Sequence, residues 1–234
     1  MKILLLAALC LLPLQTSRPA AKPTSQPAAA VQELSAKERE AIVREQLPSY
    51  PLQTCSVSGE PLGSMGDAIN HIVDGRLVRL CCKGCLKGVE KDKAGTIAKI
   101  DDAVRRAQGP SYPLEVCVVS GEPLAPNSIH NEVVGTRLLR TCCKKCGKTV
   151  AKNPRPYLEK VNAALIEAQK KSYKLTTCLI SGEALGSEPV DYLYGTQLVR
   201  MCCNSCVRVF EKNPSLFLAD LPAEQREATA PQKK

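Results

Sequence analysis

The chain has 234 residues, with 32 lysines and arginines against 23 acidic residues and only 3% aromatic side chains. The net charge of +9 is compatible with an anionic partner, but the basic residues form no dense run with interleaved aromatics, so we expect no nucleic-acid binding. The chain shows no serine–histidine–carboxylate set, no phosphate-binding glycine loop and no carboxylate pair that recurs, so we expect a protein that is not an enzyme.

The N-terminal stretch MKILLLAALCLLPLQTSRPAA places one lysine, a short apolar run and then small residues in that order. This order is typical of a secretory signal peptide, which we place at residues 1–20, and the apolar run is too short to span a bilayer. Cys10 lies inside the run, so a lipid anchor there is the alternative to plain export, although the bulky Leu9 precedes it. We therefore expect an exported chain, periplasmic or extracellular, without a transmembrane segment after cleavage.

Two stretches of biased composition flank the remaining sequence. Residues 21–34 are rich in proline, alanine and polar side chains, and we expect a flexible linker there. Residues 222–234 have a similar composition and predict a disordered tail.

Between the linker and the tail, the sequence repeats itself three times. The repeats begin with YPLQTCSVSGEPLG, YPLEVCVVSGEPLA and YKLTTCLISGEALG, at Tyr50, Tyr112 and Tyr173. Because self-similarity at a fixed period overrides any estimate of domain number from length, we expect one small unit per repeat. We place the first repeat, with a preceding helix, at residues 35–108, the second at 109–171 and the third at 172–221.

The sequence predicts a helix before the first repeat and a β-hairpin within each repeat. Ser35 and Glu38 stand at capping-box spacing and predict the helix before the first repeat. Two-residue turns between apolar or β-branched runs predict a β-hairpin in each repeat, at Asp74-Gly75, Gly135-Thr136 and Gly195-Thr196. Each hairpin leads directly into a cysteine cluster, which a short amphipathic helix is expected to follow.

Further helices are expected to connect the repeats. Asn153-Pro154 and Asn213-Pro214 predict the cap and first residue of a helix, and we expect connecting helices at about 95–108 and 155–171. The fold class is thus α+β, with three tandem small units, each a β-hairpin plus helices. A unit this small, without tryptophan, buries too little apolar surface to fold comfortably unaided, which favours disulfides or a metal ion as a staple.

Every repeat carries four cysteines in the same order, and the thirteenth cysteine of the chain is Cys10. Thiolates are preferred ligands of zinc and copper(I), which predicts about one such ion per repeat. The candidate ligands are Cys55, Cys81, Cys82 and Cys85 in the first repeat, Cys117, Cys142, Cys143 and Cys146 in the second, and Cys178, Cys202, Cys203 and Cys206 in the third.

The spacing of the cysteines bears on the choice between metal ligands, disulfides and redox thiols. An even number of cysteines in an exported chain is also compatible with disulfides, and a Cys-x-x-Cys such as Cys82 to Cys85 with thiol–disulfide exchange. A disulfide between adjacent Cys81 and Cys82 would be strained, because neighbouring side chains of an extended segment point to opposite sides. Cys81 and Cys85 are four apart and would share one face of a helix that begins at Cys81, which favours a shared ion.

The upstream cysteine of each repeat lies in a tight turn that resembles a zinc knuckle. A full knuckle would carry a second cysteine three positions on, where this chain has Ser58, Ser120 and Ser181. Three or four sulfur atoms per site are therefore expected.

These features together resemble the YHS/TRASH family of small treble-clef-like metal-binding domains. That pattern has a knuckle cysteine, a long gap, Cys-x-x-x-Cys at a helix start, an aromatic residue and Asn-Pro. The first, second and fourth cysteines of each repeat fit it, and Phe210 with Asn213-Pro214 extends the match in the third repeat. The resemblance implies treble-clef-like units with a role in heavy-metal sensing, trafficking or resistance. The extra Cys82, Cys143 and Cys203 depart from the pattern.

We therefore expect a non-enzymatic, exported protein whose repeats bind soft cations for buffering, trafficking or sensing. The alternative is a disulfide-stapled repeat protein that binds another protein of the cell envelope. Other recurring residues are assigned structural roles: His71 and His130 as surface or loop residues, Glu60, Glu122 and Glu183 in the turns, and Tyr50, Tyr112 and Tyr173 in packing.

Overall fold

The computed structural model describes residues 34–222 and contains three antiparallel hairpins, one in each repeat. The expected signal peptide lies outside the described residues, as do nearly all of the expected linker and tail. Among the described helices, none combines the length and the apolar character that crossing a bilayer requires.

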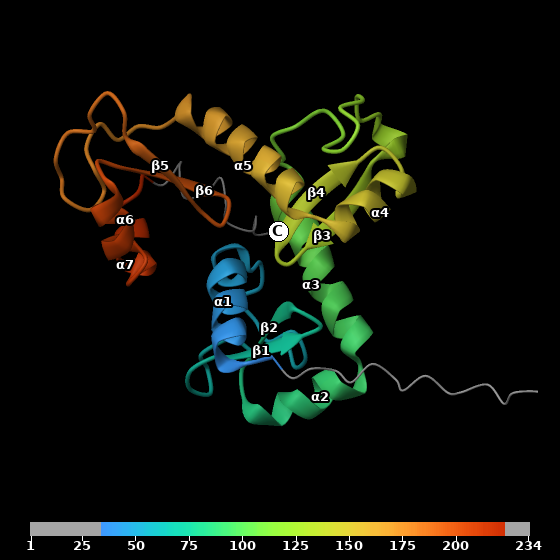
Figure 1. Cartoon of the computed structure of the whole chain (residues 1–234). Helices are drawn as coiled ribbons and strands as arrows, with labels where there is room; N and C mark the ends of the chain where they lie inside the picture. Colours follow the sequence, from blue (N-terminus) through green and yellow to red (C-terminus); the bar gives the residue numbers. More distant parts are fainter. Residues whose placement is uncertain (1–33, 223–234) are drawn as a thin grey trace, which may run out of the picture. The chain divides into compact units, whose positions relative to one another are not determined.

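In each repeat a β-hairpin is followed by a short helix and then by a second helix (Figure 1). The first repeat contains α1 (Ala36–Gln46), the 3₁₀ helix η1 (Leu47–Ser49), β1 (Ile69–Val73), β2 (Arg76–Leu80), the 3₁₀ helix η2 (Lys83–Cys85), α2 (Leu86–Lys91) and α3 (Lys93–Gln108). The second contains the 3₁₀ helix η3 (Pro126–Ser128), β3 (His130–Val134), β4 (Arg137–Thr141), α4 (Lys144–Lys152) and α5 (Arg155–Lys170). The third contains β5 (Val190–Tyr194), β6 (Gln197–Met201), α6 (Asn204–Phe210) and α7 (Pro214–Leu218).

The hairpin turns lie where the sequence predicts them. In the first hairpin Val73 pairs with Arg76, so the turn holds only Asp74 and Gly75, whose φ angles are 49° and 75°. Two positive φ angles are what a type I′ turn requires. The other two hairpins also close around two residues, and their glycines, Gly135 and Gly195, adopt positive φ.

Helix ends agree with the sequence at some positions and differ at others. Ser35 and Glu38 form the predicted capping box of α1, and Pro214 is the first residue of α7 as expected. Asn153 does not cap α5, because Pro154 takes the N-cap position. Asp92, in contrast, caps α3 by accepting a hydrogen bond from the backbone N–H of Gly95.

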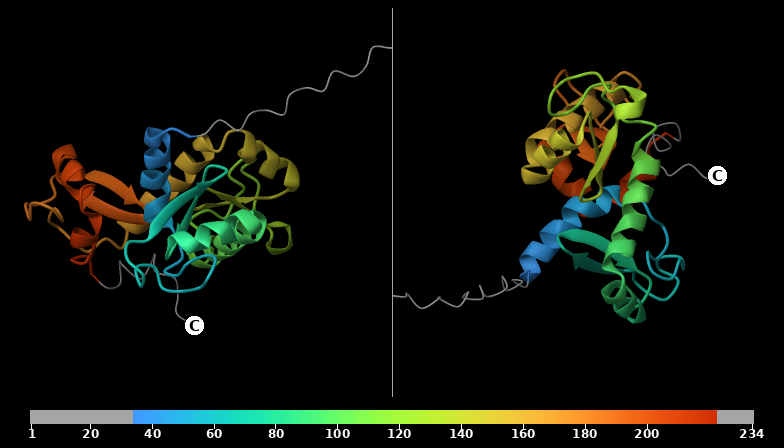
Figure 2. Two further views of the ribbon diagram at one scale, coloured as in Figure 1. Left: turned by 90° about the horizontal axis from the view of Figure 1, so that it is seen from below. Right: turned by 90° about the vertical axis from the view of Figure 1, so that its right-hand side faces the viewer.

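A glutamine at the end of a helix binds the hairpin that follows it in each repeat. The Nε2 of Gln46 donates to the carbonyl of Gly75 at 2.8 Å, and its Oε1 accepts from the backbone N–H of Leu77 at 2.8 Å. Both views of Figure 2 show α1 beside the β1–β2 hairpin. Because one carboxamide satisfies a donor and an acceptor of the turn, it fixes the helix to the hairpin. The same two bonds recur from Gln108 to Thr136 and Leu138, and from Gln169 to Thr196 and Leu198.

The tyrosine that opens each repeat also binds the hairpin. The hydroxyl of Tyr50 accepts a hydrogen bond from the backbone N–H of Arg79 at 3.1 Å, and only 8% of Tyr50 is exposed. The burial of Tyr50 confirms its expected role in packing, and the hydrogen bond of its hydroxyl is an additional polar contact. Tyr112 and Tyr173 make the same bond to the backbone N–H groups of Arg140 and Arg200.

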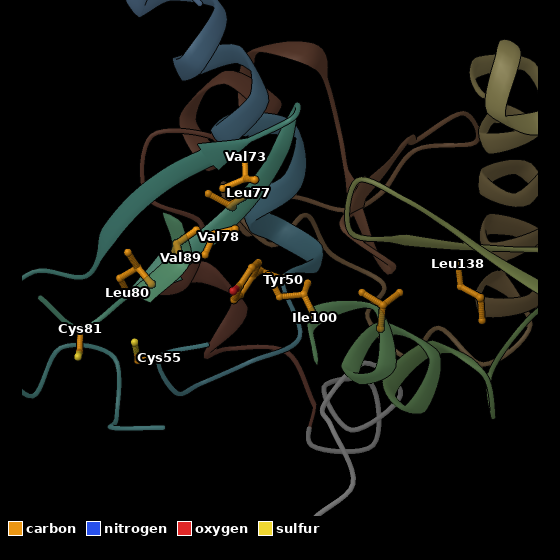
Figure 3. Packing of buried hydrophobic residues seen from close by; sticks show 11 residues of the cluster. Tyr50, Cys55, Val73, Leu77, Val78, Leu80, Cys81, Val89, Ile100 and Leu138 are labelled. Atoms are coloured by element: carbon orange, nitrogen blue, oxygen red, sulfur yellow. The ribbon is translucent and has the colours of Figure 1, made fainter. Parts of the chain in front are cut away.

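The connecting helix α3 packs against the hairpins of both the first and the second repeat. Its buried face carries Thr96, Ile100, Ala103 and Val104, at helical spacing. Ile100 belongs to the core of the first repeat, which also includes Leu138 from β4 of the second (Figure 3). Neighbouring repeats therefore share apolar surface through this helix.

We predict that Gln108→Ala destabilises the protein by about 2 kcal/mol or more, because a buried N–H of β4 and a turn carbonyl lose their partner. Urea unfolding would measure the change. Gln53→Ala is the matched control, since Gln53 is exposed and should change stability by less than about 0.5 kcal/mol. Equal effects of the two substitutions would contradict the role assigned to Gln108.

Candidate metal centres

Each site begins with a tight turn at the upstream cysteine. The N–H of Cys55 donates to the carbonyl of Glu60 at 2.7 Å, and the N–H of Gly59 donates to the carbonyl of Cys55 at 2.9 Å. Gly59 has a φ of 80°, which favours glycine at this position. The N–H of Glu60 also donates to the hydroxyl of Ser58. The expected turn role of Glu60 is thus visible in its backbone, and the same bonds recur at Cys117 and Cys178.

The cysteine cluster begins where the second strand of the hairpin ends. Cys81 follows the last residue of β2, and the next residue, Cys82, is the N-cap of η2. Cys143 and Cys203 likewise cap α4 and α6. The expectation that a helix begins at the first cysteine is therefore wrong: the first cysteine lies between the strand and the helix, and the second occupies the helix cap.

Three sulfur atoms nevertheless meet in every repeat. Within each set the Sγ atoms all lie within 4.8 Å of one another. The sets are Cys55, Cys81 and Cys85; Cys117, Cys142 and Cys146; and Cys178, Cys202 and Cys206. Figure 3 shows Cys55 and Cys81 together at the edge of the first core. The turn, the strand end and the helix each supply one sulfur, so the fold itself assembles the set.

The sulfur–sulfur distances match those around a metal ion. The distance between the Sγ atoms of the first and third cluster cysteines is 3.8 Å in the first repeat, 3.9 Å in the second and 3.7 Å in the third. Sulfurs placed tetrahedrally around zinc, at bonds of about 2.3 Å, stand about 3.8 Å apart. In each set this one pair of sulfurs therefore has the spacing of ligands on a shared zinc ion, and the knuckle sulfur lies within 4.8 Å of both.

The fourth cysteine of each repeat lies beside this set. The Sγ of Cys82 is 3.9 Å from that of Cys85. In the third repeat, the Sγ of Cys203 lies 3.8 Å from Cys202 and 3.7 Å from Cys206. Adjacent cysteine side chains thus approach each other here, contrary to the expectation that they point apart. A fourth sulfur is within reach of each site, while the tight mutual set contains three.

All twelve cysteines in the described part of the chain are free thiols. A disulfide would bring two sulfurs to about 2.05 Å, whereas the sulfurs here contact one another at 3.7 to 3.9 Å. The structure therefore presents the cysteines in the form that binds metal.

A serine hydroxyl contacts the sulfur cluster where a second knuckle cysteine would stand. The Oγ of Ser58 is 3.4 Å from the Sγ of Cys81. The corresponding distances are 3.5 Å for Ser120 to Cys142 and 3.6 Å for Ser181 to Cys202. The recurrence of this serine marks the position in the sequence, but its hydrogen bonds become evident only in three dimensions.

The pKa of the knuckle thiol is lowered in each set. Burial raises the pKa of Cys55, but hydrogen bonds from the hydroxyl and N–H of Ser58 and from the N–H groups of Cys81 and Val57 outweigh it and lower the pKa to about 6. Cys117 and Cys178 have the same surroundings and a pKa of about 6. One thiolate per site is therefore available at neutral pH.

The third cluster cysteine behaves in the opposite way. Burial and hydrogen bonds to neighbouring thiols raise the pKa of Cys85 to about 12, and the pKa values of Cys146 and Cys206 rise to the same level. Backbone N–H groups of Cys85 and Gly84 lower the pKa of Cys82. A bound cation would stabilise the thiolate form of the third cysteine and so offset these effects.

Other candidate ligands lie outside the three sulfur sets. His71 and His130 are strand residues, in β1 and β3. Glu183 lies near one sulfur, with its Oε2 3.9 Å from the Sγ of Cys202. These side chains belong at most to the surroundings of the sites.

No family model, curated protein or solved structure matches the chain.

The pKa values lead to a prediction for the folded, metal-free protein under reducing conditions. We expect thiolate absorbance near 240 nm to fall as the pH drops through about 6, because the knuckle thiols take up protons there. The joint substitution of Ser58, Ser120 and Ser181 by alanine should move this step to higher pH. Ser215→Ala should not, because the exposed hydroxyl of Ser215 donates to Asn213. Absorbance that changes only above about pH 8, as for ordinary thiols, would contradict the assignment.

Proposed function

We propose that this chain is an exported, non-enzymatic metal-binding protein in which each repeat holds one soft cation, zinc or copper(I). The observation that carries the proposal is the convergence of three sulfurs within 4.8 Å in every repeat. Thiolates are the side chains that these cations prefer, and three identical sets in one chain argue for a common ligand. The resemblance to YHS/TRASH domains points in the same direction.

The sites favour exchange of the metal over permanent retention. Structural zinc sites are closed by four protein ligands, whereas sites that exchange or react keep an open position. Here the tight set supplies three sulfurs, and the neighbouring fourth cysteine is half-buried as Cys82 and exposed as Cys203. A thiol from another molecule can approach such a site, which suits buffering, trafficking or sensing.

The proposal includes export because residues 1–20 have the order of segments that is typical of a signal peptide. A cleaved signal peptide would deliver the chain to an oxidising compartment, where a bound cation would protect thiols from forming disulfides. The mass of the mature protein would test this step, because cleavage removes the apolar run together with Cys10.

We predict that the full chain binds about three equivalents of zinc and that Cys142→Ser or Cys146→Ser removes one of them. Cys143→Ser is the matched control, because Cys143 stands outside the tight set and its loss should weaken one site by about 10- to 100-fold without removing it. Titration against a chromophoric chelator would measure both numbers. Uptake of no metal by the reduced chain would refute the proposed function, and equal losses from all three substitutions would show four-sulfur ligation.

A further inference from the structure

Arg137, in β4, has an incompletely satisfied guanidinium. Its Nη2 donates to the Oδ1 of Asn162 at 2.7 Å, while its buried Nε has no hydrogen-bond partner among the described residues. Its side chain takes part in none of the ion pairs found in the described part of the chain. Burial lowers the pKa of Arg137 to about 10, so the group stays cationic at neutral pH. A buried donor and charge without a partner require an explanation.

The corresponding arginine of the first repeat has a carboxylate partner, which the second repeat lacks. Arg76 occupies the position of Arg137 one repeat earlier, and it forms an ion pair with Asp101 of α3. The residue that corresponds to Asp101 in α5 is Asn162, an amide of the same shape without the charge. In the third repeat the arginine itself is replaced, by Gln197. Only the second repeat therefore keeps the cation and omits its carboxylate.

Arg137 lines a cavity of about 170 Å³. Most of the wall surface is apolar, with Leu138, Val161 and Leu165 among the lining residues. Polar groups are added by Gln108, Ser111, Gln169, Ser172 and Thr196. The cavity is smaller than the roughly 300–1,000 Å³ of pockets that hold drug-sized ligands. A ligand that fits it is small, apolar over most of its surface and anionic at the end that meets the arginine.

We propose that this cavity binds a small carboxylate with an apolar body, whose carboxylate supplies Arg137 with the negative charge that Asp101 supplies to Arg76. The planar guanidinium presents several donors in a geometry that matches a carboxylate, and Arg137 lines the cavity. A single arginine among apolar side chains suits a monocarboxylate better than a multiply charged phosphate. No cysteine lines the cavity, so this proposal is independent of metal binding.

Benzoate is a suitable probe, with benzamide as its neutral isostere. We expect benzoate to bind the full chain, to shift amide resonances around Arg137 and Leu165, and to raise the thermal midpoint. Benzamide should bind at least about tenfold more weakly, because it cannot form the charge-assisted bonds. Absence of benzoate binding, or equal binding of the two probes, would overturn the proposal.

Two substitutions and one control test the site itself. Asn162→Asp restores the ion pair of the first repeat, so it should raise the thermal midpoint of the free protein and weaken benzoate binding at least about tenfold. Arg137→Gln copies the third repeat and should weaken binding equally. Arg155→Gln removes an exposed charge from α5, the helix that carries Asn162, and should leave binding unchanged. Wild-type affinity in Asn162→Asp, or an equal loss in Arg155→Gln, would refute a specific site at Arg137.

Discussion

The confinement of three sulfur atoms to one small volume is the constraint on which each repeat depends. Sulfurs 3.7 to 3.9 Å apart cannot all be thiolates without a cation. The protein meets this constraint unevenly: hydrogen bonds around Ser58 hold the pKa of Cys55 near 6, while the pKa of Cys85 lies near 12. In the metal-free cluster one thiol is therefore charged at neutral pH and another is protonated. Binding of a soft cation would favour loss of that proton.

The scaffold around each cluster explains how so small a unit keeps its sulfurs in place. A tyrosine and a glutamine satisfy backbone groups of the hairpin, and they come from the segment before it. The helix α3 binds the knuckle region of the first repeat through Lys99, whose Nζ lies 3.4 Å from the carbonyl of Ser56, and it ends in Gln108, which binds the next hairpin. One helix therefore contacts the scaffold of two repeats.

Much of this arrangement could be predicted from the sequence because local chemistry determines it. The turns around Gly75 and Gly135 and the capping box at Ser35 depend on residues within a few positions of each other. The helix start was misplaced because the strand ends at Leu80, Cys81 lies between the two elements, and Cys82 takes the cap. The serine–thiol contacts and the unpaired Arg137 depend on segments more than 20 residues apart, which no local pattern reveals. The assignment of all twelve cysteines as ligands stays a prediction.

X-ray absorption at the zinc edge of the loaded full chain tests the central claim most directly, because it reports the atoms bound to the metal and their distance. Thiolate sites of the observed dimensions predict a shell of three to four sulfurs per zinc at about 2.3 Å. A shell with fewer than three sulfurs, completed by oxygen or nitrogen from elsewhere in the chain, would contradict the account, because the clusters of cysteines would then not be the ligands.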